Sequence, residues 1–280
     1  MERTLRFLKG AFGADRLLGL ALLALAVFFY KTDPYPVEFL RLKTFDYYQK
    51  IKPRDIPPPQ AKPVTIIDLD EVSLAEVGQW PWPRNIIAKL VENLMEMGAV
   101  LVAFDMVFAE PDRMNPSEVA DSIYGLDEET KQKLRALPGN DKAFADVIKN
   151  SRVVLGQSAF WEDRKIKAAP PVRKSIALRA TKKGLDPKDF LNNLPDMIRN
   201  IPVIEEGGAG HGLFSLIPEV DGIIRRVPSM FIYNGDIYPA LSVEMLRVAF
   251  QQRTSVAFAD ELGITYIGIA PKSKFPPKGL

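Results

Sequence analysis

The segment from Leu17 to Tyr30 constrains the chain most, because it runs for fourteen residues without a charge. Four basic residues against two acidic ones precede it, and Lys31 follows it. Basic residues remain on the cytoplasmic side of a membrane segment, so we expect everything after Lys31 to lie outside the cytoplasm.

Three interpretations of this segment stay open. Fourteen helical residues span about 21 Å, less than the roughly 30 Å of a hydrocarbon core, which suits a cleavable signal peptide. Ala24-Leu25-Ala26 offers a matching cleavage site. The alternative is an uncleaved anchor, extended by residues 12–14, with Arg16 and Lys31 reaching the two interfaces. A buried helix of a soluble protein is the third interpretation, which the basic flank disfavours.

The anchor interpretation divides the chain into four parts. These are a cytoplasmic N-terminus (1–16), a transmembrane anchor (17–31), a helix with a proline-rich linker (32–62) and an extracytoplasmic domain (63–280). Pro53 and the run Pro57-Pro58-Pro59 mark the stiff linker. The predicted location is the inner membrane, crossed once, with the main domain in the periplasm or outside the cell.

Composition removes several classes of function. A net charge of only +2 argues against a nucleic-acid partner. The absence of cysteine excludes disulfides, thiolate chemistry and cysteine-based zinc sites. A single histidine, His211, makes a His-rich metal site or a Ser-His-Asp triad hard to build. We expect no cofactor, no metal and no catalytic residue.

The exported part has the pattern of an α/β domain with a mixed, partly parallel sheet flanked by helices. Residues 64–69 (VTIIDL) and 100–104 (VLVAF) predict buried strands, and residues 83–97 between them predict an amphipathic helix that Gly98 ends. This order is typical of a βαβ unit with parallel strands. Residues 141–150 predict a helix, and residues 153–160 predict a third strand.

The second half gives weaker signals. Residues 162–207 are rich in charge and proline, which indicates a long surface excursion. Residues 212–217 and 222–233 resemble a hairpin pair with a turn at Asp221-Gly222, and Arg225 and Arg226 should point to opposite faces. Pro239 opens a further helix, and residues 264–269 predict a final strand.

Three stretches together resemble a known family. They are VTIIDLDEVSLAEVGQWPWPR (64–84), VAFDMVFAEPD (102–112) and PEVDGIIRRVP (218–228) with the following YPALSVEML (238–246). In this order, behind a membrane segment, they are similar to the second type of CHASE domain, the cyclase/histidine-kinase-associated sensing extracellular domain. The resemblance covers most of residues 33–280.

The resemblance implies the sensory input part of a membrane receptor. Such receptors carry this domain outside, then further membrane helices and a cytoplasmic output domain, for example a nucleotide cyclase or a kinase. Because family domains continue beyond the point where this chain ends, the resemblance implies a C-terminally truncated domain. It also implies a homodimer, and it names no ligand, so we expect an unknown ligand or envelope protein as the partner.

Five residues are candidates for ligand binding. Asp68, Asp70 and Asp105 lie at the C-terminal ends of two predicted parallel strands, and ligands of open sheets bind beyond such strand ends. Trp82 could stack on a ligand, and Arg84 could contact an anion. The structural alternatives carry more weight: Asp70 caps a helix over 71–77, Asp68 or Asp105 pairs with Arg84, and Trp82 locks the loop onto the core.

Two further features have structural explanations. The glycines at 207, 208, 210 and 212 around His211 lack the Gly-Lys-Ser/Thr run of a phosphate loop, so we expect a flexible return into a strand. A lone histidine there could sense acid pH, but is more often solvated.

Three functions follow from these patterns. A sensory module is preferred. The alternatives are a membrane-anchored envelope scaffold, and a metal-dependent hydrolase that uses Asp68, Asp70 and Asp105 with Mg²⁺ or Ca²⁺.

Overall fold

The structure is a computed structural model that describes residues 14–58, 61–166, 175–180, 182 and 184–269. The first two elements of this part of the chain are helices. Helix α2 spans Ala14–Thr32 and α3 spans Tyr35–Ile51, with the axes bent by 76° at the break between them. Within the described residues, neither helix is by itself long and apolar enough to cross a membrane, although the bent pair passes that test together.

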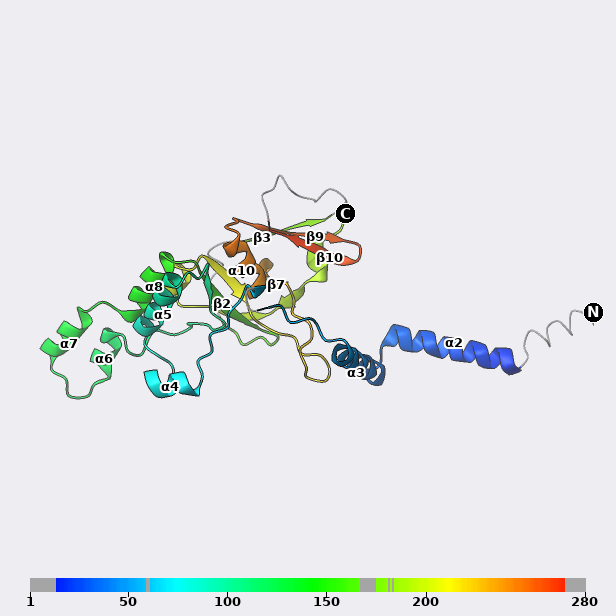
Figure 1. The fold of residues 1–280 in the computed structure, drawn as a ribbon, viewed down its shortest axis with the longest axis horizontal. Coiled ribbons are helices and arrows are strands. Elements are labelled where there is room, and N and C mark those ends of the chain that lie inside the picture. Colours follow the sequence, from blue (N-terminus) through cyan, green and yellow to red (C-terminus); the bar gives the residue numbers. More distant parts are fainter. Residues whose placement is uncertain (1–13, 59–60, 167–174, 181, 183, 270–280) are drawn as a thin grey trace, which may run out of the picture. The chain divides into compact units, whose positions relative to one another are not determined.

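The chain forms two compact units. The first contains Met1–Asp68 together with Pro218–Arg225, and the second contains Leu69–Ile217 together with Arg226–Leu280. Among the described residues, every strand belongs to the second unit, which is drawn from cyan to red in Figure 1.

The second unit is mixed α/β and has three small sheets. The sequence predicted this class of fold with a mixed, partly parallel sheet, but it did not predict the division into three sheets. In the first sheet, β2 (Val153–Phe160) pairs in parallel with β1 (Val102–Ala103) and β6 (Gly210–Leu213), and antiparallel with β5 (Asp196–Ile198). In the second, β9 (Ser255–Asp260) pairs antiparallel with β10 (Gly263–Gly268) and in parallel with β3 (Ile176–Ala180). In the third, β7 (Met230–Tyr233) lies between β4 (Asn192–Leu194), which is parallel to it, and β8 (Asp236–Pro239), which is antiparallel.

Helices cover the first sheet. The helices of this unit are α4 (Glu71–Val77), α5 (Arg84–Glu96), α6 (Pro116–Ser122), α7 (Glu128–Arg135), α8 (Asn140–Lys149), α9 (Pro202–Glu205) and α10 (Leu241–Ala249), with a 3-10 turn η2 at Pro187–Phe190. Helices α5 and α8 lie side by side (Figure 1). Their apolar stripes and β2 enclose the main core, where Phe104, Phe108 and Phe144 meet edge to face.

Several predicted elements are confirmed. The expected helix over 83–97 is α5, and Gly98 ends it with φ +94°. The expected helix at 141–150 is α8, the strand at 153–160 is β2, and the helix after Pro239 is α10.

The predicted strand at 64–69 is wrong. These residues pair with no strand, and Val64, Ile66 and Ile67 are all at least half exposed. The parallel partner of β1 is therefore β2, which lies fifty residues further along the chain. Apolar, β-branched composition gives the propensity for a strand, but the neighbouring strand decides whether one forms.

Two predictions in the second half are also wrong. The segment 162–207 is not only a surface excursion, because it contributes β3, β4, β5 and α9 with buried side chains such as Met197 and Ile204. The hairpin is formed by β7 and β8 around Asn234-Gly235, whose positive φ angles of +49° and +77° suit a tight two-residue turn. Asp221-Gly222 makes a turn without flanking strands.

Candidate functional site

The five candidate residues predicted from the sequence do not form one site. Asp68 and Asp105 are exposed. Asp70 caps α4, accepting a hydrogen bond from the Ser73 backbone nitrogen at 2.9 Å, and this bond lowers the pKa of Asp70. Trp82 is buried and its indole nitrogen donates to the Gly78 carbonyl at 2.7 Å. Arg84 alone lies in a buried group of charges.

Arg84 begins α5 and is held by aspartates other than the two predicted. Its Nε lies 3.7 Å from Oδ1 of Asp141, and its guanidinium sits 4.6 Å above the Phe108 ring. Its backbone nitrogen donates to Asp112 at 2.7 Å, so Asp112 satisfies the start of the helix. Burial lowers the pKa of Arg84, and the nearby charges of Asp112 and Asp141 raise it in part. The predicted pairing of Arg84 with Asp68 or Asp105 is therefore wrong.

Asp141 ties α8 to the loop that carries Asp112. Its Oδ2 accepts from the Asp112 backbone nitrogen at 3.0 Å and from Asn115 Nδ2 at 2.6 Å. Its Oδ1 and Arg84 Nε are both buried without a hydrogen bond, and they face each other across 3.7 Å. At this distance the two groups form an ion pair between α5 and α8, and a small shift of either side chain would bring them within hydrogen-bond distance.

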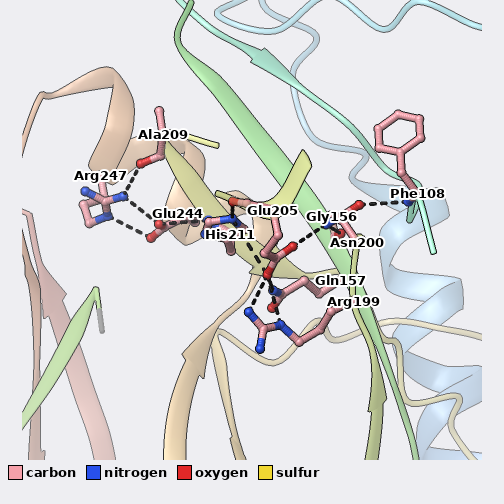
Figure 2. A network of polar contacts seen from close by, with 10 residues as sticks. All are labelled: Phe108, Gly156, Gln157, Arg199, Asn200, Glu205, Ala209, His211, Glu244 and Arg247. Carbon is pink, nitrogen blue, oxygen red and sulfur yellow. Dashed lines mark hydrogen bonds and ion pairs between the residues drawn. The ribbon is translucent and has the colours of Figure 1, made fainter. Parts of the chain in front are cut away.

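The densest polar group surrounds Glu205 at the end of α9 (Figure 2). Its carboxylate accepts from Gln157 Nε2 at 2.6 Å, from Arg199 Nε at 2.9 Å and Nη2 at 2.7 Å, and from Asn200 Nδ2 at 2.7 Å. The side chains of Glu205 and Arg199 are only 4% and 8% exposed. A charge so deeply buried must be paired and hydrogen-bonded, which is the arrangement observed.

Asn200 and His211 extend this group in two directions (Figure 2). Asn200 accepts from the Phe108 backbone nitrogen at 2.8 Å, which brings the group to the ring that Arg84 covers. His211 is mostly buried, with Nε2 2.7 Å from the backbone oxygen of Glu205, so this nitrogen carries the hydrogen. The expectation of a solvated histidine is therefore wrong.

A second buried ion pair lies on α10. Glu244 accepts from Arg247 Nε at 2.9 Å and Nη2 at 2.6 Å, and also from the His211 backbone nitrogen at 3.2 Å. Arg247 donates in addition to the Ala209 carbonyl at 3.0 Å (Figure 2). The polar network thus runs from the Phe108 backbone nitrogen to α10, across β2 and β6.

Close packing, and not flexibility, explains the glycines around His211. A Cβ at Gly210 would lie 2.5 Å from Oε1 of Glu244, and one at Gly212 would lie 2.5 Å from the Cα of Leu241. Strand β6 and helix α10 approach each other too closely for any side chain at these positions.

The first unit has its own charged group, the loop–helix cluster, formed by Lys43, Asp46, Asp221 and Arg225. Arg225 donates to both oxygens of Asp46 at 2.8 Å and to both oxygens of Asp221 at 2.7–2.8 Å, and Lys43 reaches Asp221 at 2.9 Å. The Arg225 and Asp221 side chains are 7% and 5% exposed. Hydrogen bonds from Arg225 lower the pKa of both carboxyls and raise the pKa of Arg225 itself. Arg226, by contrast, is exposed.

Each of these groups joins elements that are separate along the chain. Within the described ranges, no group of three or more histidine, aspartate or glutamate side chains lies close enough to hold a metal ion. The buried carboxylates of Asp112, Asp141, Glu205 and Glu244 already accept several donors each. The hydrolase hypothesis for Asp68, Asp70 and Asp105 gains no support.

Sequence reasoning missed Glu205, Arg199 and the Glu244–Arg247 pair. One signal was available: Glu244 and Arg247 are three residues apart on the face of α10 that also carries Val248. Charges at core positions of an amphipathic helix are expected to pair when buried. Nothing local marks Glu205, because its partners come from β2 and from the chain after β5.

A family model described as the CHASE2 domain matches residues 20–277, almost the whole chain. No curated protein and no solved structure matches the chain.

Proposed function

The chain belongs to the CHASE2 family of sensory extracellular domains, and from this premise we propose that it is the extracytoplasmic input module of a membrane receptor. The observation that carries the proposal is the extent of the match. It begins at residue 20, inside α2, and continues to residue 277, so the apolar helix and the α/β unit form one family module. In this proposal the module acts on a cytoplasmic output domain.

Membrane anchoring is part of the proposal. The large apolar and aromatic side chains of α2 are exposed, from 40% at Phe29 to 83% at Tyr30. Such a continuous apolar surface is stable in a bilayer and costly in water. The basic residues that precede α2 favour a cytoplasmic N-terminus, with the domain on the other side of an inner membrane.

The module itself would not be an enzyme. Its buried charges are used in structural pairs, and a sensory role requires elements that move together, not a reactive group. The loop–helix cluster joins residues that are 179 positions apart, Asp46 and Arg225, and so links a loop of the family motif PEVDGIIRRVP to α3. We propose that a ligand or an envelope protein acts on a homodimer of this module and biases the helices that lead to the membrane.

Sidedness tests the anchored arrangement directly. Because the chain contains no cysteine, one introduced cysteine carries the only thiol. We would compare Tyr124→Cys, at a fully exposed position of the second unit, with Thr4→Cys in the N-terminal segment, in spheroplasts treated with a membrane-impermeant maleimide. The cysteine at 124 should be labelled in intact spheroplasts, and the one at 4 only after permeabilisation. Equal labelling of both before permeabilisation would contradict the proposal.

The scaffold alternative is separated by cross-linking. A receptor module should be recovered from cells mainly as a cross-linked pair of its own chains. A stable stoichiometric complex with a different envelope protein would favour a scaffold instead.

A further inference from the structure

Helix α3 has two faces of different character. One face carries Tyr35, Phe39, Leu42, Asp46 and Gln49, spaced at i, i+4, i+7, i+11 and i+14. It is the face used within the first unit, because Leu42 is buried and Asp46 binds Arg225.

The opposite face is an exposed stripe of apolar and aromatic residues, which we name the outer stripe. Leu40, Thr44, Tyr47, Tyr48 and Ile51 follow the spacing i, i+4, i+7, i+8 and i+11. The four large side chains of the stripe are 62–64% exposed. The Thr44 hydroxyl donates to the Leu40 carbonyl at 2.8 Å, so this polar group is satisfied within the helix.

From this arrangement we infer that α3 lies flat in the membrane–water interface, with the outer stripe against an anionic lipid surface. The inference rests on the proposed insertion of α2 into the bilayer. If α2 runs along the membrane normal, the 76° bend leaves α3 about 14° from the membrane plane (90° minus 76°). The break at residues 33–34 thus turns the chain from crossing the bilayer to following its surface.

Composition fits this environment. Tyrosine is enriched where apolar tails meet water, because its ring is apolar and its hydroxyl is wet. From Tyr35 to Arg54 five basic residues stand against two acidic ones, a net charge of +3 (five minus two). Helices with one apolar face and a basic surplus bind at anionic lipid interfaces.

The inference gives the loop–helix cluster a position. Asp46 is on the face opposite the outer stripe, so Arg225 and the loop 218–225 would sit on the side of α3 that faces away from the lipid. A movement of that loop would then act on a helix supported along its length by the membrane surface.

The test uses the full chain in vesicles of phosphatidylethanolamine and phosphatidylglycerol, with one spin-labelled cysteine at a time. Thr44→Cys reports on the outer stripe, Gln49→Cys is the matched control on the other face of α3, and Leu22→Cys reports on α2. The collision rates of each label with oxygen, which concentrates in lipid, and with a water-soluble nickel chelate are compared. We expect the oxygen-to-nickel ratio to be several-fold higher at 44 than at 49, and highest at 22.

The three labels separate the two proposals. A high ratio at 22 with equal, low ratios at 44 and 49 would overturn the interfacial position of α3 and leave the anchor standing. A low ratio at 22 would overturn the anchor, and with a low ratio at 44 the interfacial inference falls as well. Spin–spin broadening at 44 that disappears on dilution with unlabelled protein would show a second copy on the stripe, and would also overturn the lipid assignment.

Discussion

Removing the charge of Glu205 should destabilise the second unit strongly. In Glu205→Gln the amide oxygen can take the place of Oε1 and keep the three hydrogen bonds, one from Gln157 and two from Arg199. The acceptor of these three bonds is then a neutral amide oxygen and no longer a charged carboxylate. The amide nitrogen then faces Asn200 Nδ2 across 2.7 Å, where two donors oppose each other.

The structure sets the size of the effect. Hydrogen bonds to a charged group are roughly twice as strong as neutral ones, so each of the three retained bonds loses about 1 kcal/mol. The lost Asn200 bond adds about 1 kcal/mol, for a total of about 4 kcal/mol. This agrees with the roughly 3–5 kcal/mol expected when one partner of a buried ion pair is removed.

Urea unfolding of the full chain in detergent micelles measures this cost. The three tryptophans, Trp80, Trp82 and Trp161, all lie in the second unit, so intrinsic fluorescence follows that unit and not α2. With a slope of about 3 kcal/mol per molar urea, the midpoint should fall by more than about 1 M.

A surface ion pair provides the matched control. Lys142 and Asp146 pair at 2.8 Å on α8 with side chains 67% and 58% exposed, so Asp146→Asn should cost less than about 1 kcal/mol. A double-mutant cycle with Arg199→Met and Glu205→Leu should give a coupling energy of about 1–3 kcal/mol. If Glu205→Gln shifted the midpoint no more than Asp146→Asn does, the buried network would not stabilise the unit as described.

Three further predictions concern packing and pH. Gly212→Ala should cost about 1–3 kcal/mol or more in the same urea assay, because the new Cβ meets backbone atoms of Leu241. In the control Gly139→Ala the nearest atom is the side-chain oxygen of Asn115 at 3.4 Å, so the cost should be that of a poorer N-cap for α8, about 1 kcal/mol or less. The pKa of Asp221 is lowered in the folded state, so the stability of the loop–helix cluster is fully present above the unfolded pKa of about 3.9 and is lost as pH falls through the folded pKa. After correction for the intrinsic rate, hydrogen exchange in loop 218–225 should therefore be constant from neutral pH to about pH 5. An unprotected loop at neutral pH would contradict the cluster. Burial raises the pKa of Tyr238 to about 12, so the difference in tyrosinate absorbance between the protein and Tyr238→Phe should titrate well above the usual pKa of about 10. Because the unfolded chain ionises first, the stability of the fold should fall as pH rises above about 10. A difference spectrum that titrates near about 10 would contradict the burial of Tyr238.

The sequence predicted the elements whose signal is local. The stripe of α5, the stop at Gly98 and the strand over 153–160 depend on neighbouring residues, and all three are confirmed. The Asn234-Gly235 turn carried an equally local signal, which the sequence prediction passed over in favour of Asp221-Gly222.

Features that depend on distant partners could not be predicted in this way. Residues 64–69 have the composition of a strand but no strand beside them, and Arg84 pairs with Asp141, which lies 57 positions away. The Glu205 network gathers donors from two separate segments, β2 and the residues after β5, and no spacing along the chain predicts that they meet. Family resemblance supplied the proposed function, because the residues alone predicted only an exported α/β domain.

The central claim, that this domain is the input of a receptor, is tested most directly by the output of the whole gene product. The output activity of the intact protein in membranes would be compared with that of a form lacking residues 64–280, at equal membrane abundance. The proposal predicts that the deletion changes the output or removes its response to envelope conditions. Output that is the same with and without these residues, under every condition to which the intact protein responds, would contradict it.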